Sequence, residues 1–445
     1  MEETVESEAT ALEGKDPELD SKYRYWRMAA WFGTWLAYAG LYLGRKAISV
    51  APPEMMKEFG WQADKAPFMI AGYLWAYALG QFVNGVLGDK LGSRVMLALG
   101  FCVTIAMNFL FGFSSTFLLF FFLWTLNGYA QSVGWPSVIK VLSNWFSVRE
   151  RGKVMGPWGT CYTVGDFVAT VVASFIIGHA AVHTVVRGGE SVAYKDWRWA
   201  FWTVAGLMVV VAVVALILIR NKPEDKGLPS IARYHGLKEE KGASEKVDLL
   251  KNAKEVLTQV PIWILGITYF GIKYIRYSFL YLITTYLATQ KHFSTENAGY
   301  ISTLFTLAGV AGTIVGSYLS DKAFSSRRAP ITVIMLLGLC ASLFFFWKTS
   351  GWGIPVALGL VGFFAMGPDF LVSAVAVMDY GSRKGAGTAA GFVNGLGSFG
   401  PAVMATASGF QLKGGDWSSF FLTLIVLSIL CALLMSTLWT SVGKN

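Results

Sequence analysis

The chain has 445 residues, of which 54% are hydrophobic and 15% are charged, and its formal net charge is +9. The apolar residues form twelve long blocks of about 20 residues, the length that crosses a hydrocarbon core of about 30 Å. This pattern excludes a soluble multidomain protein and indicates a polytopic helical membrane protein. No nucleophile–base pair, metal cluster or nucleotide-binding loop stands out, so we expect neither an enzyme nor a cofactor.

The order of the blocks divides the chain into four parts. We predict a polar N-terminal tail (1–25), a first six-helix bundle (26–220), a cytosolic linker (221–258) and a second six-helix bundle (259–445). The expected spans are 28–52, 66–88, 94–113, 117–146, 152–180, 197–219, 260–289, 296–319, 329–348, 353–380, 385–411 and 417–440. The expected fold class is an all-α membrane protein with 12 transmembrane helices in two pseudo-symmetric bundles and with both termini cytosolic.

The tail and the distribution of charge set the expected orientation. The tail is mostly acidic and lacks a basic segment followed by an apolar core, so it does not have the pattern of a cleaved signal peptide. With the tail in the cytosol, 24 of the 37 Lys and Arg lie in inside loops and tails, eight in outside loops and five within spans. This positive-inside bias accounts for the net charge without a nucleic-acid partner.

The first span, 28–52, carries two basic residues inside its apolar run, Arg45 and Lys46. A buried arginine costs about 2.5–3.5 kcal/mol at a helix centre on insertion scales, so such a residue usually faces a partner, a cavity or a substrate. Tyr38, Tyr42 and Arg45 follow an i, i+4, i+7 spacing and share one helix face. Lys46 is turned by about 100° from Arg45, so we do not expect it in the same shell of contacts.

Two matching loops follow the second and eighth spans. The first reads GVLGDKLGSR (85–94) and the second GSYLSDKAFSSRR (316–328), with Asp89 and Asp321 at corresponding places. Matching cytosolic loops in two six-helix halves imply parallel repeats. The pattern GxLxDxxGxR resembles the loop signature of the major facilitator superfamily and, with twelve spans, predicts that fold. We expect Asp89, Arg94 and Asp321 to act in gating, as a latch between the halves, rather than to bind substrate.

The seventh span places two more bases on one helix face, because Lys273 and Arg276 are three residues apart. A pseudo-twofold axis would bring Arg45 and Arg276 to opposite sides of one site. Such a pair favours a phosphate ester, which carries about −1.5 to −2 charges at pH 7 and matches the arginine fork. The alternative is that each base pairs with a buried acid, Asp166 or Asp369. Three basic residues against two acidic ones leave about one positive charge uncompensated, which favours the anion site.

Other polar residues have simpler interpretations. Lys140 lies nine residues before Arg149, about 13 Å along a helix, so its ammonium is expected to reach the cytosolic interface in a structural role. His179 and His183 are spaced i, i+4 without a third ligand, so we expect no metal site. The segment 247–257 is expected to form an amphipathic helix on the membrane surface. The cysteines are expected to be buried apolar residues.

Five segments resemble the organophosphate:phosphate antiporters, which include bacterial glycerol-3-phosphate and hexose-phosphate transporters and eukaryotic glucose-6-phosphate translocases. These segments are YLGRKAISV (42–50), FLWTLNGYAQSVGWPSVIKVLSNWF (122–146), NKPEDKGLP (221–229), IRYSFLYLITTYLATQKHF (275–293) and GAGTAAGFVNGLGSFG (385–400). The block LNGxxQxxGWP (126–136) is the most specific of these signals. The resemblance covers nearly all of 25–440 and implies import of a phosphorylated metabolite in exchange for inorganic phosphate.

The resemblance also assigns roles to residues. In that family one arginine on each of the first and seventh helices grips the phosphate, and these positions fall on Arg45 and Arg276. The first-helix tyrosines of the glycerol-phosphate branch fall on Tyr38 and Tyr42. A lysine that the glucose-6-phosphate translocases carry on the seventh helix falls on Lys273.

The sequence departs from the glycerol-phosphate branch at five positions. A fifth-helix histidine, a second-helix lysine, an eighth-helix acid, a tenth-helix tyrosine and an eleventh-helix tyrosine are replaced here by Tyr162, Gln81, Thr306, Met366 and Ser398, in that order. These departures argue against glycerol 3-phosphate as the substrate and leave the phosphate grip intact. Tyr162 and Gln81 stay candidates for substrate binding at the replaced positions.

Added polar residues suit a bulkier, polyhydroxylated substrate. They are Asp166, Lys273, Asp369 and Asn394. Either aspartate is expected to bind sugar hydroxyls or, equally, to pair with Lys273. Trp158 has the best claim of the tryptophans to a place in the site, although most aromatic residues of the spans are expected in packing and interface belts.

We therefore expect a monomer that exchanges a sugar phosphate, glucose 6-phosphate or another hexose phosphate, for inorganic phosphate by alternating access. Its partners are these solutes and the lipid bilayer, in the cell (inner) membrane or, in a eukaryote, the endoplasmic reticulum membrane. Two unpaired arginines would repel the halves of the empty carrier, and a phosphate dianion would draw them together. The alternatives are a transporter-like sensor of external hexose phosphate and a proton-coupled organic-anion symporter with Asp166 or Asp369 as proton carrier.

Overall fold

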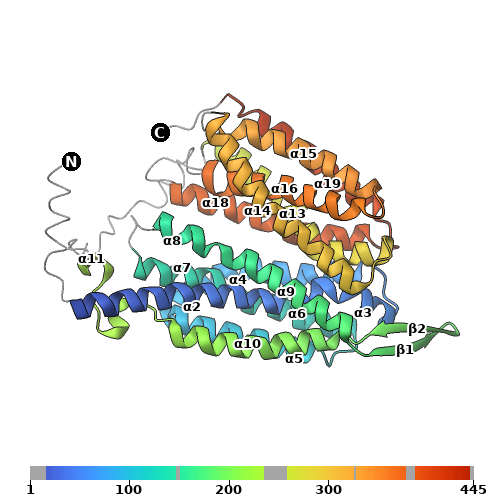
Figure 1. Cartoon of the computed structure of the whole chain (residues 1–445), viewed down its shortest axis with the longest axis horizontal. Coiled ribbons are helices and arrows are strands. Elements are labelled where there is room, and N and C mark those ends of the chain that lie inside the picture. Colours follow the sequence, from blue (N-terminus) through green and yellow to red (C-terminus); the bar gives the residue numbers. More distant parts are fainter. Residues whose placement is uncertain (1–16, 147–150, 235–257, 325–326, 377–385, 441–445) are drawn as a thin grey trace.

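The computed structural model describes residues 17–146, 151–234, 258–324, 327–376 and 386–440. Figure 1 shows two helical bundles side by side, one from the blue-to-green half of the chain and one from the yellow-to-red half. A β-hairpin extends from one end of the molecule, which we call the hairpin end. Helix α11 (Ile231–Tyr234) lies at the opposite end, which we call the α11 end (Figure 1).

The first bundle contains the elements up to α10, and a short connector follows it. In chain order the elements are α2 (Pro17–Val50), α3 (Pro52–Phe59), α4 (Lys65–Leu91), α5 (Ser93–Phe111), α6 (Phe117–Gln131), α7 (Gly134–Trp145), α8 (Arg151–Trp158), α9 (Thr160–His179), β1 (Val182–Arg187), β2 (Glu190–Lys195), α10 (Arg198–Leu218) and the 3₁₀-helix η1 (Pro223–Lys226).

The second bundle contains the elements from α13 onward. These are α13 (Val260–Gln290), α14 (Thr295–Lys322), α15 (Arg328–Lys348), α16 (Gly353–Phe370), the π-helix η2 (Leu371–Ala376), α18 (Ala386–Gln411) and α19 (Ser418–Ser436). The expected amphipathic helix over 247–257 lies outside the described residues.

Seven helices in the described part of the chain are long and apolar enough to cross a membrane: α5, α9, α10, α14, α15, α16 and α19. The other expected spans also form helices, namely α2, α4, α6 with α7, α13 and α18, but these are shorter or less apolar. The total of twelve crossings and the cytosolic placement of the termini stay predictions.

The same pairs of helices pack together in each bundle. In the first bundle α4 packs on α6, α2 on α9 and α5 on α10, and in the second α14 packs on α16, α13 on α18 and α15 on α19. These pairs correspond by their order along the chain. The contacts between bundles correspond too, because α4 meets α18 and α9 meets α14. The packing is therefore that of two parallel repeats related by a pseudo-twofold axis.

Three expected spans are broken where proline removes a helix hydrogen bond. The span 117–146 divides into α6 and α7 because Pro136 cannot donate to the carbonyl of Ser132. The span 152–180 divides into α8 and α9 after Pro157, and the span 353–380 changes to the π-helix η2 shortly after Pro368.

The N-terminal tail was expected to extend to Tyr25, but α2 begins at Pro17. This extension packs against the connector after α10, with the ring of Tyr23 stacked on that of Tyr234 at 3.8 Å. The Tyr234 hydroxyl donates to the Asp20 carboxylate, and burial together with this carboxylate raises the pKa of Tyr234 to about 12. The start of the connector is therefore part of the first bundle.

The β-hairpin between α9 and α10 was not expected from the sequence. Its strands pair antiparallel with Arg187 opposite Glu190, and the two turn residues, Gly188 and Gly189, have φ values of 58° and 87°. A two-residue turn of this kind needs positive φ at both positions, which glycine adopts without strain. The Gly-Gly pair between residues of high β propensity was the available signal.

Contacts between the bundles run from the middle of the molecule to the hairpin end. The Thr295 hydroxyl of α14 donates to the Glu54 carboxylate of α3, and both side chains are buried. Trp75 Nε1 of α4 donates to Thr406 Oγ1 of α18 over 3.2 Å. In Figure 1 the two bundles diverge from this end toward the α11 end.

Candidate functional site

Arg45, on α2, is held by a neutral side chain. Its Nε donates to Gln131 Oε1 over 2.8 Å, and the Tyr73 hydroxyl donates to the same oxygen over 3.0 Å. The guanidinium lies 4.3 Å from the centre of the Tyr42 ring. Its Nη2 is buried and has no hydrogen-bond partner among the described residues. Arg45 is therefore fixed in place while a strong donor is left for a further acceptor.

Gln131, which orients Arg45, lies at the helix break and is held by a chain of hydrogen bonds. It is the last residue of α6, and its Nε2 donates to Asn127 Oδ1 over 3.3 Å. Asn127 Nδ2 in turn donates to the carbonyl of Gly44 over 2.9 Å. Gln131 and Asn127 were not predicted as site residues, although both lie in the LNGxxQxxGWP block. The fixed spacing of polar residues in that block was the signal for them.

Lys46 points away from Arg45, as the helical spacing predicts, and pairs with an acid. Its Nζ lies 3.0 Å from Asp166 Oδ1 on α9 and donates to the carbonyl of Leu280 on α13 over 2.7 Å. Asp166 Oδ2 accepts a hydrogen bond from Thr306 Oγ1 on α14 over 3.1 Å. Asp166 therefore pairs with Lys46 and not with Lys273, and this cluster joins the two bundles.

Arg276, on α13, pairs with Asp369 at the end of α16. Arg276 Nη1 lies 3.1 Å from Asp369 Oδ2, and both side chains are 13% exposed. Asp369 therefore pairs with Arg276, which is the alternative of a base paired with a buried acid, and not with Lys273, the other partner considered from the sequence. The expectation of two unpaired arginines in the empty protein is wrong for Arg276, because the last turn of α16 brings a carboxylate beside it.

Lys273 has neutral partners. Its Nζ donates to Asn394 Oδ1 over 3.0 Å and to Ser398 Oγ over 3.3 Å, both on α18, and lies 4.7 Å from the centre of the Tyr269 ring. No carboxylate lies within 4 Å of Lys273 or of Arg45 among the described residues. These two cations therefore carry the excess positive charge of the site.

Aromatic side chains connect the two arginines. Arg276 lies 6.0 Å from the centre of the Tyr162 ring, which belongs to α9 of the other bundle. The Arg45 guanidinium lies 4.3 Å from the centre of the Tyr42 ring and 5.5 Å from that of Tyr77. The residues predicted to share one phosphate are thus gathered around the contact between α2, α9 and α13.

Other predicted residues lie further from the arginines or are occupied elsewhere. Tyr38 packs on Trp158 with ring centres 5.9 Å apart, and Trp158 Nε1 donates to Thr34 Oγ1 over 3.0 Å, so the tryptophan acts in packing. Gln81 is half-buried on α4, and no described contact ties it to either arginine.

The expected gating residues are described in part. Arg94 donates from its backbone to Asn221 Oδ1 over 2.8 Å and from Nε to the carbonyl of Leu216 over 3.0 Å. These contacts lie within the first bundle and its connector. The side chains of Asp89 and Asp321 lie outside the described residues, so the proposed latch stays a prediction.

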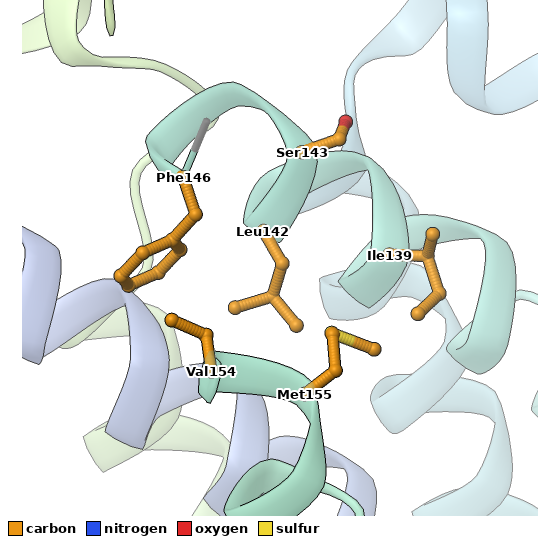
Figure 2. Close-up of a pocket in the computed structure, with 6 residues that line it drawn as sticks. All are labelled: Ile139, Leu142, Ser143, Phe146, Val154 and Met155. Carbon is orange, nitrogen blue, oxygen red and sulfur yellow. The ribbon is translucent and has the colours of Figure 1, made fainter. Parts of the chain in front are cut away.

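Two pockets near the α11 end are separate from this site. A small apolar pocket between α7 and α8 is lined by Ile139, Leu142, Ser143, Phe146, Val154 and Met155 (Figure 2). A more polar cavity of about 410 Å³ lies beside it and includes Lys140, whose Nζ donates to the carbonyl of Gly88 over 3.1 Å. Neither pocket contains a residue of the arginine site.

The charges around the two arginines do not balance. Arg45, Lys46, Lys273 and Arg276 supply four positive charges, and Asp166 and Asp369 supply two negative ones. The net charge of this group is therefore +2. Buried charge of this size needs compensation, and a doubly charged anion would supply it.

Comparison with known proteins identifies the family of the chain. The Major Facilitator Superfamily profile matches residues 34–394 and 269–444. The "Probable hexose phosphate transport protein" of Chlamydia pneumoniae is 30% identical over 95% of this chain and 93% of its own length. The "Glycerol-3-phosphate transporter" of Bacillus subtilis (strain 168) is 28% identical over 97% and 96% of the two chains.

A solved structure shares the fold. It is a bacterial homologue of the human lysosomal transporter Spinster, in an inward-facing and occupied conformation, with a TM-score of 0.72 and 14% identity over 96% of this chain and 98% of that chain. The matches span nearly the whole chain in both sequence and structure. The chain therefore belongs to the organophosphate:phosphate antiporter family of the major facilitator superfamily, a family of multi-pass membrane transporters and not of enzymes.

Proposed function

We propose that this protein carries a sugar phosphate, with a hexose phosphate as the preferred class, across the membrane in exchange for inorganic phosphate. The observation that carries the proposal is the net charge of +2 around Arg45 and Arg276, with a buried guanidinium donor of Arg45 that has no described partner. Relatives named as hexose phosphate and glycerol-3-phosphate transporters support an organophosphate substrate.

The phosphate would bind between the bundles. Arg45 is oriented by Gln131 so that its outer nitrogen is available. Arg276 of the opposite bundle lies 6.0 Å from the centre of the ring of Tyr162, which belongs to the bundle of Arg45. Arginine forks bind phosphate oxygens bidentately, so one phosphate held by both would link α2 to α13. Tyr162 lies 6.0 Å from Arg276, and Lys273, one helical turn from Arg276, is bound to Asn394. These three side chains would contact the sugar.

The contacts at the hairpin end support alternating access. If the start of α2 is cytosolic, the Glu54–Thr295 contact closes the outer side and the bundles diverge toward the cytosol. The bound anion would then favour closure of the inner side by linking the bundles across the site. Alternating access of this kind requires one repeat to rock against the other.

The proposal is tested in proteoliposomes. Vesicles loaded with inorganic phosphate should take up labelled glucose 6-phosphate, and vesicles loaded with chloride should take up little. Competition by a panel of unlabelled phosphates then ranks the substrates. Equal uptake with and without internal phosphate would overturn the exchange mechanism.

Two further outcomes identify the alternatives. Uptake that follows an imposed pH gradient and ignores internal phosphate indicates a proton-coupled symporter. Saturable binding of hexose phosphate to purified protein without any uptake indicates a sensor.

A further inference from the structure

The pairing of Arg276 with Asp369 implies more than structural neutralisation. In the structure one oxygen of the carboxylate, Oδ2, contacts Arg276, while Asp369 Oδ1 and Arg276 Nε are buried and have no hydrogen-bond partner among the described residues. In a buried ion pair with a purely structural role, both of these atoms are expected to have hydrogen-bond partners. The pair is therefore incomplete.

The backbone at Asp369 is suited to movement. Asp369 follows Pro368, which removes a helix hydrogen bond, and precedes the π-helix η2 (Leu371–Ala376). Short π-helical segments occur frequently at functional sites. A second cation, Lys273, lies three residues before Arg276 on the same face of α13. Asp369 therefore contacts Arg276 on a helix face that carries two cations.

We propose that Asp369 is a resident counter-anion of Arg276, which substrate phosphate displaces toward Lys273, and that its negative charge limits the preference of the site for dianions over monoanions. This inference rests on the proposed function and assigns its charge selectivity to one residue. Asp369 is then a specificity-determining residue and not a ligand for the sugar.

The reason is a matter of charge. With Asp369 ionised the group carries +2, which a dianion neutralises fully and a monoanion leaves at +1. A monoanion that replaces Asp369 on Arg276 exchanges one unit of negative charge for another and gains little. Without the carboxylate the group carries +3, so every anion binds more tightly, and a dianion gains about twice as much as a monoanion from the added charge.

The test measures displacement of labelled inorganic phosphate from the purified full-length protein by phosphate, sulfate and dimethyl phosphate. Sulfate is a dianion and dimethyl phosphate is a monoanion that cannot ionise further. Asp369→Asn should bind phosphate about tenfold more tightly, and its preference for sulfate over dimethyl phosphate should rise by about tenfold, because a dianion gains twice from the added positive charge. Asp369→Glu, which keeps the charge, should retain the wild-type preference.

A second pair of variants covers failure of Asp369→Asn to fold. Lys273→Met lowers the group to +1 and should weaken sulfate more than dimethyl phosphate. The double variant Asp369→Asn/Lys273→Met returns to +2 and should return toward the wild-type preference. An unchanged preference in Asp369→Asn, or equal weakening of both anions in Lys273→Met, would overturn the inference. If the wild-type protein binds neither phosphate nor sulfate, the proposed function itself fails.

Discussion

Gln131 illustrates how a single neutral residue controls the charge of this site. It accepts hydrogen bonds from Arg45 and Tyr73 and is fully buried. An amide at this position orients the guanidinium without cancelling its charge. A carboxylate would form an ion pair with Arg45 and leave it unable to attract an external anion.

Gln131→Glu should therefore fold and lose phosphate affinity by at least about tenfold, because the new carboxylate occupies the Nε donor and neutralises Arg45. Isothermal titration of phosphate against the purified variant measures the loss. The matched control is Gln411→Glu on α18, whose side chain donates to Thr423 Oγ1 over 2.7 Å away from the arginines. Wild-type affinity in Gln131→Glu would show that Arg45 does not bind the phosphate.

The residues that carry charge in the spans could be predicted from the sequence because each departs from an apolar background. Their partners could not. Lys46 with Asp166 and Arg276 with Asp369 are separated by 120 and 93 positions in the chain, so no local spacing indicates the pairing. Gln131 was not predicted as a site residue because the role of a buried neutral amide is clear only when its hydrogen bonds are known.

At the scale of helices, close approach determines how the second bundle packs. Gly312 of α14 lies against α16, where an added Cβ would be 1.9 Å from the carbonyl oxygen of Phe363 and 2.9 Å from its Cα. Backbone atoms cannot rotate away as a side chain can, so α14 and α16 would have to separate.

Gly312→Ala should lower the stability of the protein by about 1–3 kcal/mol, the usual cost of overpacking. Thermal unfolding of the detergent-solubilised protein measures this change. Gly206→Ala on α10 is the control, because nothing lies within 4 Å of the added Cβ and alanine favours helix more than glycine. Equal melting temperatures for the two variants would mean that the helices pack less closely than described.

The helices could be predicted from hydropathy, whereas their interruptions required knowledge of packing. The breaks at Pro136 and Pro157 were visible as prolines, but proline is tolerated in membrane helices when neighbours satisfy the backbone. The hairpin β1–β2 was not predicted because its two strands have only six residues each and lie between two long apolar spans. Its Gly-Gly turn between valine-containing strands was a local signal for it.

For the whole molecule, the Glu54–Thr295 contact is the one that we expect to stabilise closure of the hairpin end. Glu54 is 2% exposed and also accepts from the backbone N–H of Lys195, over 2.8 Å. Loss of the Thr295 donor would leave Glu54 Oε1 with only the Lys57 ammonium, at 2.9 Å, as its donor among the described residues whenever this end is closed. The open state has water to satisfy it.

Thr295→Val should therefore increase opening at the hairpin end by about tenfold. The measurement is the rate at which a membrane-impermeant thiol reagent labels Ser174→Cys in a background without the native cysteines, because Ser174 of α9 lies against Gly299 of α14. Thr289→Val, which removes a hydrogen bond to the carbonyl of Thr285 within α13, is the control. If both variants label alike, this contact does not control the gate.

The central claim is that Arg45 and Arg276, one from each bundle, bind the same phosphate. A double-mutant cycle on phosphate affinity tests it most directly. Arg45→Lys and Arg276→Lys keep the charge but lose the planar fork, so each should weaken binding by about tenfold. The double variant should bind phosphate much less than one hundredfold more weakly than the wild type. If both arginines bind one phosphate, loss of one contact already weakens the other. Additive losses, or wild-type affinity in either single variant, would contradict the shared site.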